Sequence, residues 1–138
     1  MPRLSQQEAE AYVSEAHVAH LITVRPDGRP HVVPVWFDWQ GETVLVMTSG
    51  QAVKVRNIRG NPTVALSVAT DQRPYIYVVL EGEARVHTDN LAEVANRICV
   101  HYDGPERGTA YAQELLAEGA MVLIEIRVSR MTAWKESE

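Results

Sequence analysis

The sequence predicts a mainly β fold, a six-stranded antiparallel split β-barrel with three or four short helices. The first observation is that apolar, β-branched segments are separated by short turns, Pro26-Asp27-Gly28-Arg29 and Gln40-Gly41-Glu42. Turns this short join antiparallel strands, because parallel crossovers need a dozen or more residues. The second observation is that helical periodicity is confined to short segments between the strands. Antiparallel strands with helices at the corners are typical of a small closed or split barrel.

The N-terminal segment is expected to form the first helix, from residue 5 to about residue 16. Ser5-Gln-Gln-Glu8 is a capping-box pattern, in which the serine and glutamate side chains satisfy free backbone N–H groups. The residues that then fall on one face of the helix, and are expected to face the core, include Ala9, Tyr12 and Val13.

Six strands are expected, at residues 17–25, 31–39, 43–48, 63–69, 75–87 and 121–134. Pro30 and Pro34 cannot donate ladder hydrogen bonds, so the second strand is expected to lie at a sheet edge or to bulge at Pro34. Gly82, inside the fifth strand, indicates a β-bulge.

Three further helices are expected, after residue 50 to about 58, over about 91–102 and over about 109–118. Gly60-Asn61-Pro62 ends the first of them, Asp89 caps the second, and Gly119 ends the third. In the second helix the residues expected to face the core are Leu91, Val94, Ala95 and Ile98.

The bulk composition indicates a single domain over residues 1–138, with 46% hydrophobic residues to supply its core. A net charge of -5 argues against a nucleic-acid partner, which usually needs a strongly basic face. A single cysteine, Cys99, excludes an intrachain disulfide and a cysteine-based zinc site. No apolar run approaches bilayer length and no basic-then-apolar leader is present, so we expect no membrane partner and a cytoplasmic location.

Residues 48–62 are the strongest candidate for a binding segment. The chain is acidic, yet no Asp or Glu occurs between Glu42 and Asp71. Thr48 and Ser49 end a strand, and the helix that follows would present free backbone N–H groups together with Lys54. This combination suits an anionic group such as a phosphate. The alternative is a solvated basic helix with no ligand.

The aromatic segment Val32–Trp39 is a second candidate. In an extended strand Trp36 and Asp38 share one side, while Phe37 lies on the other. A strand of this kind, interrupted by proline, could form the wall for a planar ring. The alternative is that Phe37 and one of the tryptophans belong to the core, where aromatic side chains are common.

No residue pattern identifies a catalytic side chain, so the catalytic residues stay unassigned. The histidines are scattered, and no metal-ligand spacing, catalytic triad or dinucleotide-binding glycine motif is present. No metal is therefore expected. An anion site and an aromatic wall without acid–base residues are best explained if a bound cofactor carries the chemistry.

Taken together, these segments resemble the pyridoxamine 5′-phosphate oxidase-like, FMN-binding split-barrel superfamily. The resemblance is carried by residues 21–37, by Thr48-Ser49 followed by Lys54-Val-Arg-Asn57, and by Asn61-Pro62. Within the superfamily the chain is most similar to the deazaflavin (coenzyme F420)-dependent reductases, a branch that the ending Arg130-Met-Thr-Ala-Trp134 also fits.

The resemblance implies a homodimer with cofactor sites at its interface and a small-molecule substrate. The residues expected to hold the cofactor phosphate are Thr48, Ser49, Lys54 and Asn57. Those expected to line its ring system are Val33, Pro34, Val35 and Trp36. The anionic tail that deazaflavins carry is expected to meet Arg56 and Arg59. The residues expected to reach the site from the partner subunit are Tyr75 and Tyr77.

The expected function is that of an F420-dependent oxidoreductase, which transfers hydride between the cofactor and a small unsaturated or conjugated substrate. The Arg-x-Val-Leu-Leu-Lys segment and the arginine-rich C-terminal site of true pyridoxamine phosphate oxidases do not occur, which argues against vitamin B6 oxidation. Two alternatives stay open. One is an FMN-dependent oxidoreductase of the same fold, and the other is a non-catalytic cofactor- or haem-binding split barrel, with a haem ligand among His17, His20 and His31.

Overall fold

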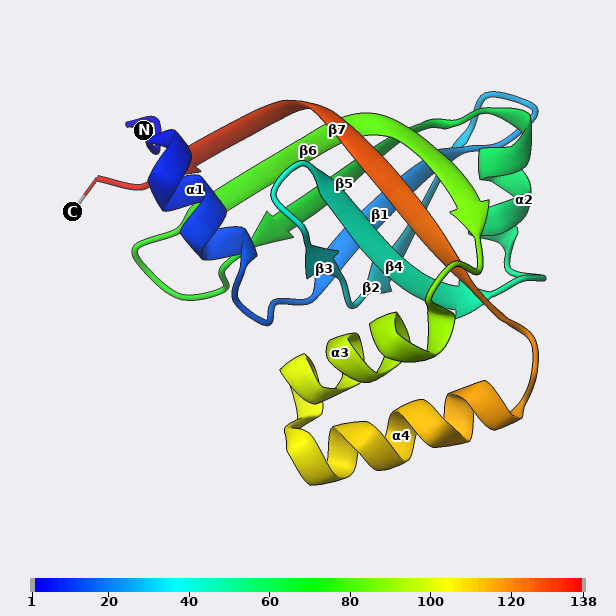
Figure 1. Ribbon diagram of the computed structural model, residues 1–138. Coiled ribbons are helices and arrows are strands. Elements are labelled where there is room, and N and C mark those ends of the chain that lie inside the picture. Colours follow the sequence, from blue (N-terminus) through cyan, green and yellow to red (C-terminus); the bar gives the residue numbers. More distant parts are fainter. Residues whose placement is uncertain (1, 138) are drawn as a thin grey trace.

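The computed structural model describes residues 2–137, which form one curled β-sheet with helices around it (Figure 1). The strands found in this range are β1 Ala19–Val24, β2 Pro30–Val35, β3 Asp38–Trp39, β4 Thr43–Ser49, β5 Thr63–Ala69, β6 Ile76–His87 and β7 Met121–Lys135. The helices are α1 Gln6–Val13, α2 Val53–Gly60, α3 Leu91–Asp103 and α4 Pro105–Ala117. All strand pairs are antiparallel, so the predicted mainly β, antiparallel fold with short helices is confirmed.

The strand order β2-β1-β5-β6-β7-β4-β3 explains how the sheet closes. β2 and β3 lie at opposite edges of the sheet, yet only Trp36 and Phe37 separate them in the chain. The two edges therefore meet at this corner, and the sheet curls into a split barrel. The predicted count of six strands is wrong, because the seven-stranded sheet divides residues 31–39 between its two edges. The chain leaves one edge at Val35 and joins the other at Asp38.

Helices α1 and α2 lie at opposite ends of the barrel (Figure 1). The predicted capping box of α1 is confirmed: the Ser5 hydroxyl accepts a hydrogen bond from the Glu8 N–H at 3.1 Å, and the Glu8 carboxylate accepts one from the Ser5 N–H at 3.0 Å. Both helices bury apolar side chains in the main core, and these include Tyr12, Val13, Val55 and Ile58. Burial of these side chains, rather than helix propensity, holds such short helices in place.

Two predictions about strand irregularity are also confirmed. β2, which contains Pro30 and Pro34, lies at an edge of the sheet, where the missing N–H donors cost no ladder bonds. The register between β6 and β7 shifts between Glu81 and Gly82, as a bulge requires. A Cβ atom at Gly82 would collide with the carbonyl oxygen of Arg127, so only glycine allows the two strands to pair here.

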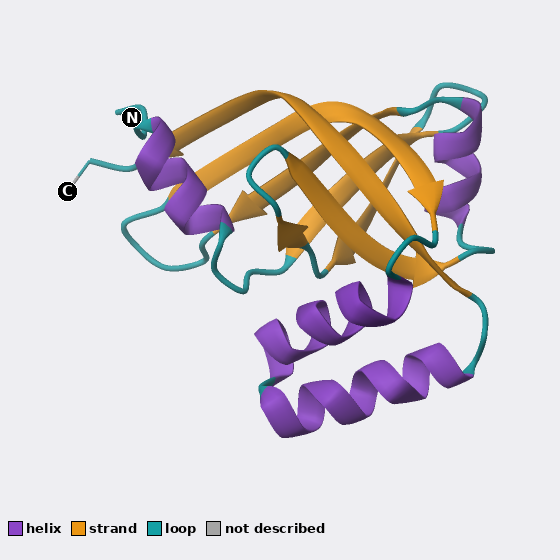
Figure 2. Ribbon diagram, in the orientation of Figure 1, coloured by secondary structure: helices purple, strands orange, loops and turns teal. Residues whose placement is uncertain are grey.

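Helices α3 and α4 form a hairpin that lies as a separate layer beneath the barrel in Figure 2. Helix α3 begins after Asn90, whose backbone is left-handed with φ 55°, so the prediction that Asp89 caps it is wrong. Helix α4 begins at Pro105, earlier than predicted, and continues through Gly108. Gly108 is buried against α3, where an added Cβ would lie 2.5 Å from the Cys99 carbonyl oxygen.

Candidate functional site

A pocket of ≈ 320 Å³ lies between the barrel and the α3–α4 hairpin, where β4 ends and α2 follows. Its walls come from the corner after β2, the end of β4, the first turn of α2 and the facing sides of α3 and α4. The pocket brings together six of the predicted site residues, namely Pro34, Val35, Trp36, Thr48, Ser49 and Lys54. Residues far apart in the sequence thus meet at one pocket, and their role in holding a cofactor stays a prediction.

The polar end of the pocket is formed by the β4–α2 junction. Thr48 is buried, and the Ser49 hydroxyl accepts a hydrogen bond from the Gln51 N–H at 3.3 Å. Helix α2 has Ala52 as its N-cap, with no side-chain capping bond, so backbone N–H groups of the first turn remain available to a ligand. Lys54 lies in this first turn, and burial lowers the pKa of its ammonium group. A half-buried cation beside free N–H groups fits the phosphate of a cofactor.

Residues 2–137 provide no carboxylate within ion-pair distance of Lys54. A partly desolvated ammonium group without a counter-charge is costly, because burial disfavours its charged form. An anionic ligand would remove that cost. The chemistry of this donor set therefore supports the anion site predicted from residues 48–62.

The other end of the pocket is apolar and aromatic. The Trp36 ring stacks on Tyr102 with centroids 4.6 Å apart and an interplanar angle of 5°, and it meets the edge of Tyr111 at 6.0 Å. The remaining wall was missed from the sequence and consists of Met47, Ile98, Cys99, Tyr111, Leu115 and Met121. Burial raises the pKa of the Cys99 thiol, so this group stays protonated near neutral pH. Cys99 is a free cysteine and is buried.

Two predicted ligand residues point into the protein instead of lining this pocket. Asn57 is 3% exposed, and its side-chain Nδ2 donates a hydrogen bond of 3.0 Å to the hydroxyl of buried Thr23. This pair ties α2 to β1. Val33 packs against the main core. The assignments of Asn57 to the phosphate and of Val33 to the ring remain predictions, and for Asn57 the amide already has a partner inside the barrel.

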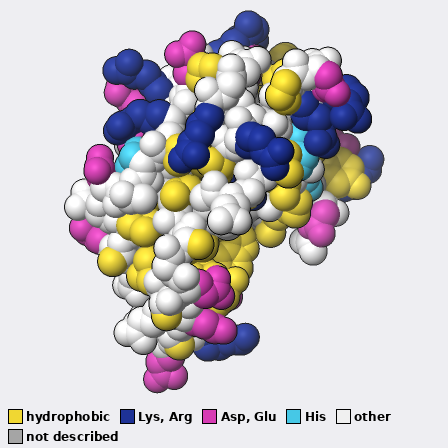
Figure 3. Space-filling model, turned by 90° about the vertical axis from the view of Figure 1, so that its right-hand side faces the viewer, with side chains coloured by type: hydrophobic (Ala, Val, Ile, Leu, Met, Phe, Trp, Pro, Cys, Tyr) yellow, Lys and Arg dark blue, Asp and Glu magenta, His cyan; other side chains and the backbone are white. Residues whose placement is uncertain are grey.

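The predicted tail residues lie on the outer side of α2. Arg56 lines a second pocket of ≈ 330 Å³, which it shares with Arg25 and Arg29 of the β1–β2 hairpin. Arg59 is exposed in the last turn of α2 and belongs to neither pocket. Figure 3 shows Lys and Arg side chains gathered over the upper part of the face that carries α2, with apolar side chains below them. The middle of this face, between acidic side chains at its margins, is therefore positive although the whole chain is acidic.

Tyr77 lies far from the pocket within one chain. It pairs with Trp134 near the end of β7, whereas Ser49 pairs with Met121 at the start of the same strand. Strand residues advance by about 3.3 Å each, so the two positions are separated by most of the length of the barrel. Tyr75, before β6, is 42% exposed at the same distant end. Both tyrosines would need a second subunit to reach a cofactor.

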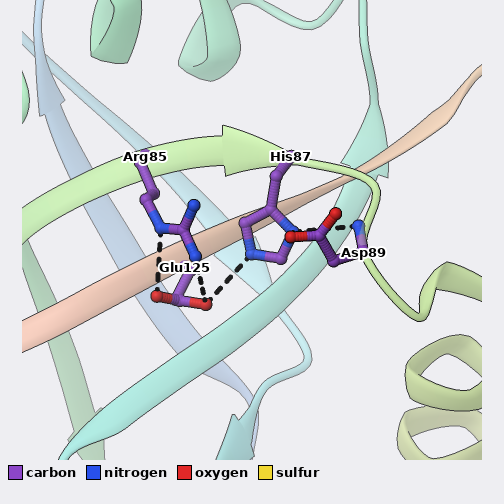
Figure 4. Close-up of polar contacts among 4 residues, drawn as sticks. All are labelled: Arg85, His87, Asp89 and Glu125. Carbon is purple, nitrogen blue, oxygen red and sulfur yellow. Dashed lines mark hydrogen bonds and ion pairs between the residues drawn. The ribbon is translucent and has the colours of Figure 1, made fainter.

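A polar cluster outside the pocket was not predicted and joins β6 to β7 (Figure 4). The Glu125 carboxylate accepts hydrogen bonds from Arg85 at 3.2 and 3.3 Å, and its Oε1 lies 3.0 Å from His87 Nε2. The other ring nitrogen of His87 accepts a bond of 3.1 Å from the Asp89 N–H, just before α3. Burial alone would raise the pKa of Glu125, but the hydrogen bonds from Arg85 and His87 outweigh it, and the pKa is lowered. This cluster stabilises the junction from which the helical hairpin begins.

The described residues form no metal-binding cluster. Within residues 2–137 no group of three His, Cys, Asp or Glu side chains is arranged to hold a metal ion. None of the histidines lines the pocket beside Lys54. Over the same range, no helix has both the length and the apolar character that crossing a bilayer requires.

Comparison with known proteins places this geometry in a family. Residues 5–135 match the family model described as Pyridoxamine 5'-phosphate oxidase. An F420H(2)-dependent biliverdin reductase of Mycobacterium tuberculosis (strain CDC 1551 / Oshkosh) is 38% identical over 89 residues, which are 63% of this chain and 62% of the relative. The match thus spans less than two thirds of that curated relative.

Solved structures agree with the family match. An F420 reductase is 30% identical, with a TM-score of 0.71, over 88% of this chain and 94% of its own. A conserved hypothetical protein of Mycobacterium tuberculosis has a TM-score of 0.82 at 22% identity, over 96% of this chain and 85% of its own, and this likeness concerns the fold alone. The resemblance drawn from the sequence is confirmed, because the family match extends over nearly all of the described residues. This chain belongs to the pyridoxamine 5'-phosphate oxidase family.

Proposed function

We propose that this protein is an oxidoreductase that uses the deazaflavin coenzyme F420 and transfers hydride between the cofactor and a small unsaturated or conjugated substrate. The observation that carries the proposal is the pocket in which a cationic, N–H-rich end and an aromatic end face each other. Similarity to an F420 reductase and to an F420H(2)-dependent biliverdin reductase supports this choice of cofactor. The protein then needs no acid–base side chain of its own, because the cofactor carries the reaction.

The polar end of the pocket would hold the cofactor phosphate. Thr48 and Ser49 supply hydroxyl donors, Lys54 supplies a charge, and the first turn of α2 supplies backbone N–H groups. Charge-assisted hydrogen bonds of this kind are about twice as strong as neutral ones. They would fix the far end of the cofactor and so determine where its ring lies.

The corner after β2 would orient the ring system. β2 is an edge strand, so backbone groups along its free side are available to a heterocycle. Pro34 and Val35 line the pocket there, next to the Trp36 ring, and Val33 belongs to the same strand. A bound deazaflavin would supply the hydride chemistry. The apolar wall from α3 and α4 would keep water away from the reacting atoms.

The positive face on α2 favours the more anionic of the two candidate cofactors. Arg56 and Arg59 are exposed, and no carboxylate among the described residues pairs with them. We assign them to the anionic tail that F420 carries and FMN lacks. The phosphate site alone does not separate the cofactors, so FMN is the competing outcome of the test below.

We also propose that the active form is a homodimer. Val18 and Val32 are 53% and 55% exposed beside β1 and on β2, and Tyr75 is 42% exposed. Exposed apolar side chains of this size support a contact surface on the outside of the sheet. A second copy bound there would bring its Tyr77 toward the first copy's pocket. A Val32→Lys variant that stays dimeric by light scattering would contradict this choice of surface.

The cofactor is tested by titrating the purified protein with F420 and with FMN and following the fluorescence of each. We expect F420 to bind at least about tenfold more tightly, a difference of about 1.4 kcal/mol. Tighter binding of FMN would overturn the assignment. A reductase screen with conjugated enones, quinones and linear tetrapyrroles, using the tighter cofactor, then identifies the substrate class.

A further inference from the structure

The inner face of the β1–β2 hairpin holds two buried nitrogen atoms that lack hydrogen-bond partners. These are Nε of Arg25 and Nδ1 of His31, for which residues 2–137 provide no partner. Thr23 lies directly opposite His31 in the register and is fully buried against Asn57 of α2. The hairpin face that carries Thr23 and His31 is therefore covered by α2. Buried polar atoms are rarely left unpaired, so these two nitrogens are available to a ligand.

The charges around His31 indicate the chemistry of that ligand. Burial lowers the pKa of His31, and the positive charges of Arg25 and Lys54 lower it further. Both cations are thus close enough to the imidazole to repel its protonated form. The one acid in the hairpin, Asp27, accepts hydrogen bonds from the Arg29 guanidinium at 2.8 Å and from the Arg29 N–H at 3.1 Å. The charges of Arg25 and Lys54 thus both act on His31, and none of these three side chains forms an ion pair with a carboxylate of the described residues.

Lys54 connects this cluster to the pocket already described. Lys54 lines the pocket between the barrel and the helical hairpin, whereas Arg25 lines the second pocket beside Val53 and Arg56. The two cations that act on His31 therefore belong to different pockets, Lys54 to the first and Arg25 to the second. An anion between the three side chains would give Nε of Arg25 and Nδ1 of His31 their missing partner and would balance the charge of Lys54.

We propose that Arg25 and His31, together with Lys54, bind the oxygens of a phosphate-type anion, with His31 protonated in the bound state. Binding then takes up one proton from solvent at neutral pH, where free His31 is unprotonated. Within the proposed function, on which this assignment rests for its biological ligand, the anion is the phosphate of the cofactor or of the substrate. His31 is thereby an anion-binding residue, and Arg25 contributes a fixed charge at every pH.

Sulfate is the probe, because its charge is constant between about pH 5.5 and 8, so any pH dependence of its binding comes from the protein. The imidazole nitrogens of the histidines are followed by NMR while sulfate is added to the unliganded protein. We expect His31 Nδ1 to shift and the His31 pKa to rise. We also expect sulfate affinity to increase about tenfold as the pH falls across this range, as a charge-assisted bond to His31 requires.

Variants separate the roles of the two residues. His31→Gln should remove the pH dependence and weaken sulfate binding about tenfold near pH 6, whereas Arg25→Gln should weaken it at every pH. His20→Gln is the matched control, since His20 is exposed on the opposite face of β1. The inference is overturned if sulfate leaves the His31 signals of the wild-type protein unchanged, or if His31→Gln and His20→Gln behave alike.

A competition experiment identifies the source of the anion. Displacement of sulfate from His31 by F420 or FMN assigns the site to the cofactor phosphate. If either cofactor binds while the His31 signals stay at their sulfate-bound positions, the site belongs to a second phosphate-bearing ligand. Sulfate binding at His31 in a protein that binds neither cofactor would uphold the anion site while refuting the proposed function, so the two failures are distinguishable.

Discussion

The rings of Trp36 and Tyr102 lie in nearly parallel planes with their centroids 4.6 Å apart, and they connect the corner after β2 to helix α3. The Tyr102 hydroxyl donates a hydrogen bond of 2.6 Å to the His17 carbonyl and accepts one of 3.1 Å from the Phe37 N–H. Burial raises the pKa of Tyr102, so its hydroxyl remains a donor across the neutral range. One side chain of α3 therefore fixes both the backbone at the barrel corner and the aromatic wall of the pocket.

Removing only this hydroxyl should destabilise the protein without opening the pocket. In Tyr102→Phe the ring still stacks on Trp36, but the Phe37 N–H and the His17 carbonyl lose their partner. We expect the free energy of unfolding to fall by about 1–3 kcal/mol. Urea unfolding measures this, and Tyr111→Phe is the control because Tyr111 makes no such bond among the described residues. Equal stability of the two variants would mean that the hydroxyl has no structural role.

Gly108 sets the distance between α3 and α4. A Cβ at this position would lie 2.5 Å from the Cys99 carbonyl oxygen and from the Val100 Cα, which are backbone atoms that cannot rotate away. Gly108→Ala should therefore push the helices apart and cost about 1–3 kcal/mol of unfolding free energy. Gly60→Ala is the control, because nothing lies within 4 Å of its added Cβ. If Gly108→Ala proves as stable as Gly60→Ala in urea, the hairpin is looser than its geometry indicates.

Local signals explain how much of the fold is predictable from the sequence. The capping box at Ser5, the proline-bearing edge strand and the bulge at Gly82 each depend on a few adjacent residues, and all are confirmed. The break at Trp36-Phe37 depends on two sheet edges meeting after the whole barrel has closed, which no local pattern encodes. Gly108 is a similar case, because its role lies in contact with α3.

The pocket likewise has a part that local sequence signals predict and a part that depends on how the folded chain packs. Thr48, Ser49 and Lys54 were found because a strand end, a helix start and a charge are adjacent in the sequence. The wall that includes Cys99 and Tyr111 comes from a helical hairpin whose position on the barrel could not be read locally. The sequence shows a stripe of apolar residues on α3, but the same periodicity is found in helices that only pack against a core and line no pocket.

Substitution of Asn57 distinguishes a structural role inside the barrel from the phosphate-binding role that the family resemblance implies. Its amide bonds Thr23 inside the barrel, so Asn57→Ala would leave the buried hydroxyl unpaired and cost about 1–3 kcal/mol. Combining Asn57→Ala with Thr23→Val should restore part of that loss, because both polar partners are then removed. Urea unfolding of the single and double variants measures the coupling. Additive losses, together with a large drop in cofactor affinity, would favour a role at the phosphate instead.

The Glu125 cluster should make stability fall in acid. The pKa of Glu125 is lower in the folded protein than in the unfolded chain, so its contribution is complete above the unfolded value and is lost as the pH falls through the folded value. Glu125→Gln should be less stable than wild type at pH 7 and should flatten the stability profile below about pH 4.5. Thermal unfolding from pH 3 to 7 measures both effects. Glu83→Gln, an exposed change on β6, should leave the profile unchanged.

Lys54 should favour ligand binding at the expense of stability. Burial lowers its pKa in the folded state, so the charged side chain destabilises the unliganded protein at neutral pH, and this cost disappears only as the pH rises toward the unfolded value. Lys54→Gln should thus be equal to wild type or more stable, by about 1 kcal/mol or less after solvent screening.

The same substitution should weaken cofactor binding about 10- to 100-fold, because a charge-assisted bond to phosphate is lost. Thermal unfolding and a fluorescence titration on one preparation measure the two effects. Arg107→Gln is the matched control, since Arg107 is an exposed cation in α4 that does not line the pocket. A Lys54→Gln variant that binds as tightly as Arg107→Gln would show that the cation at the start of α2 is only surface charge.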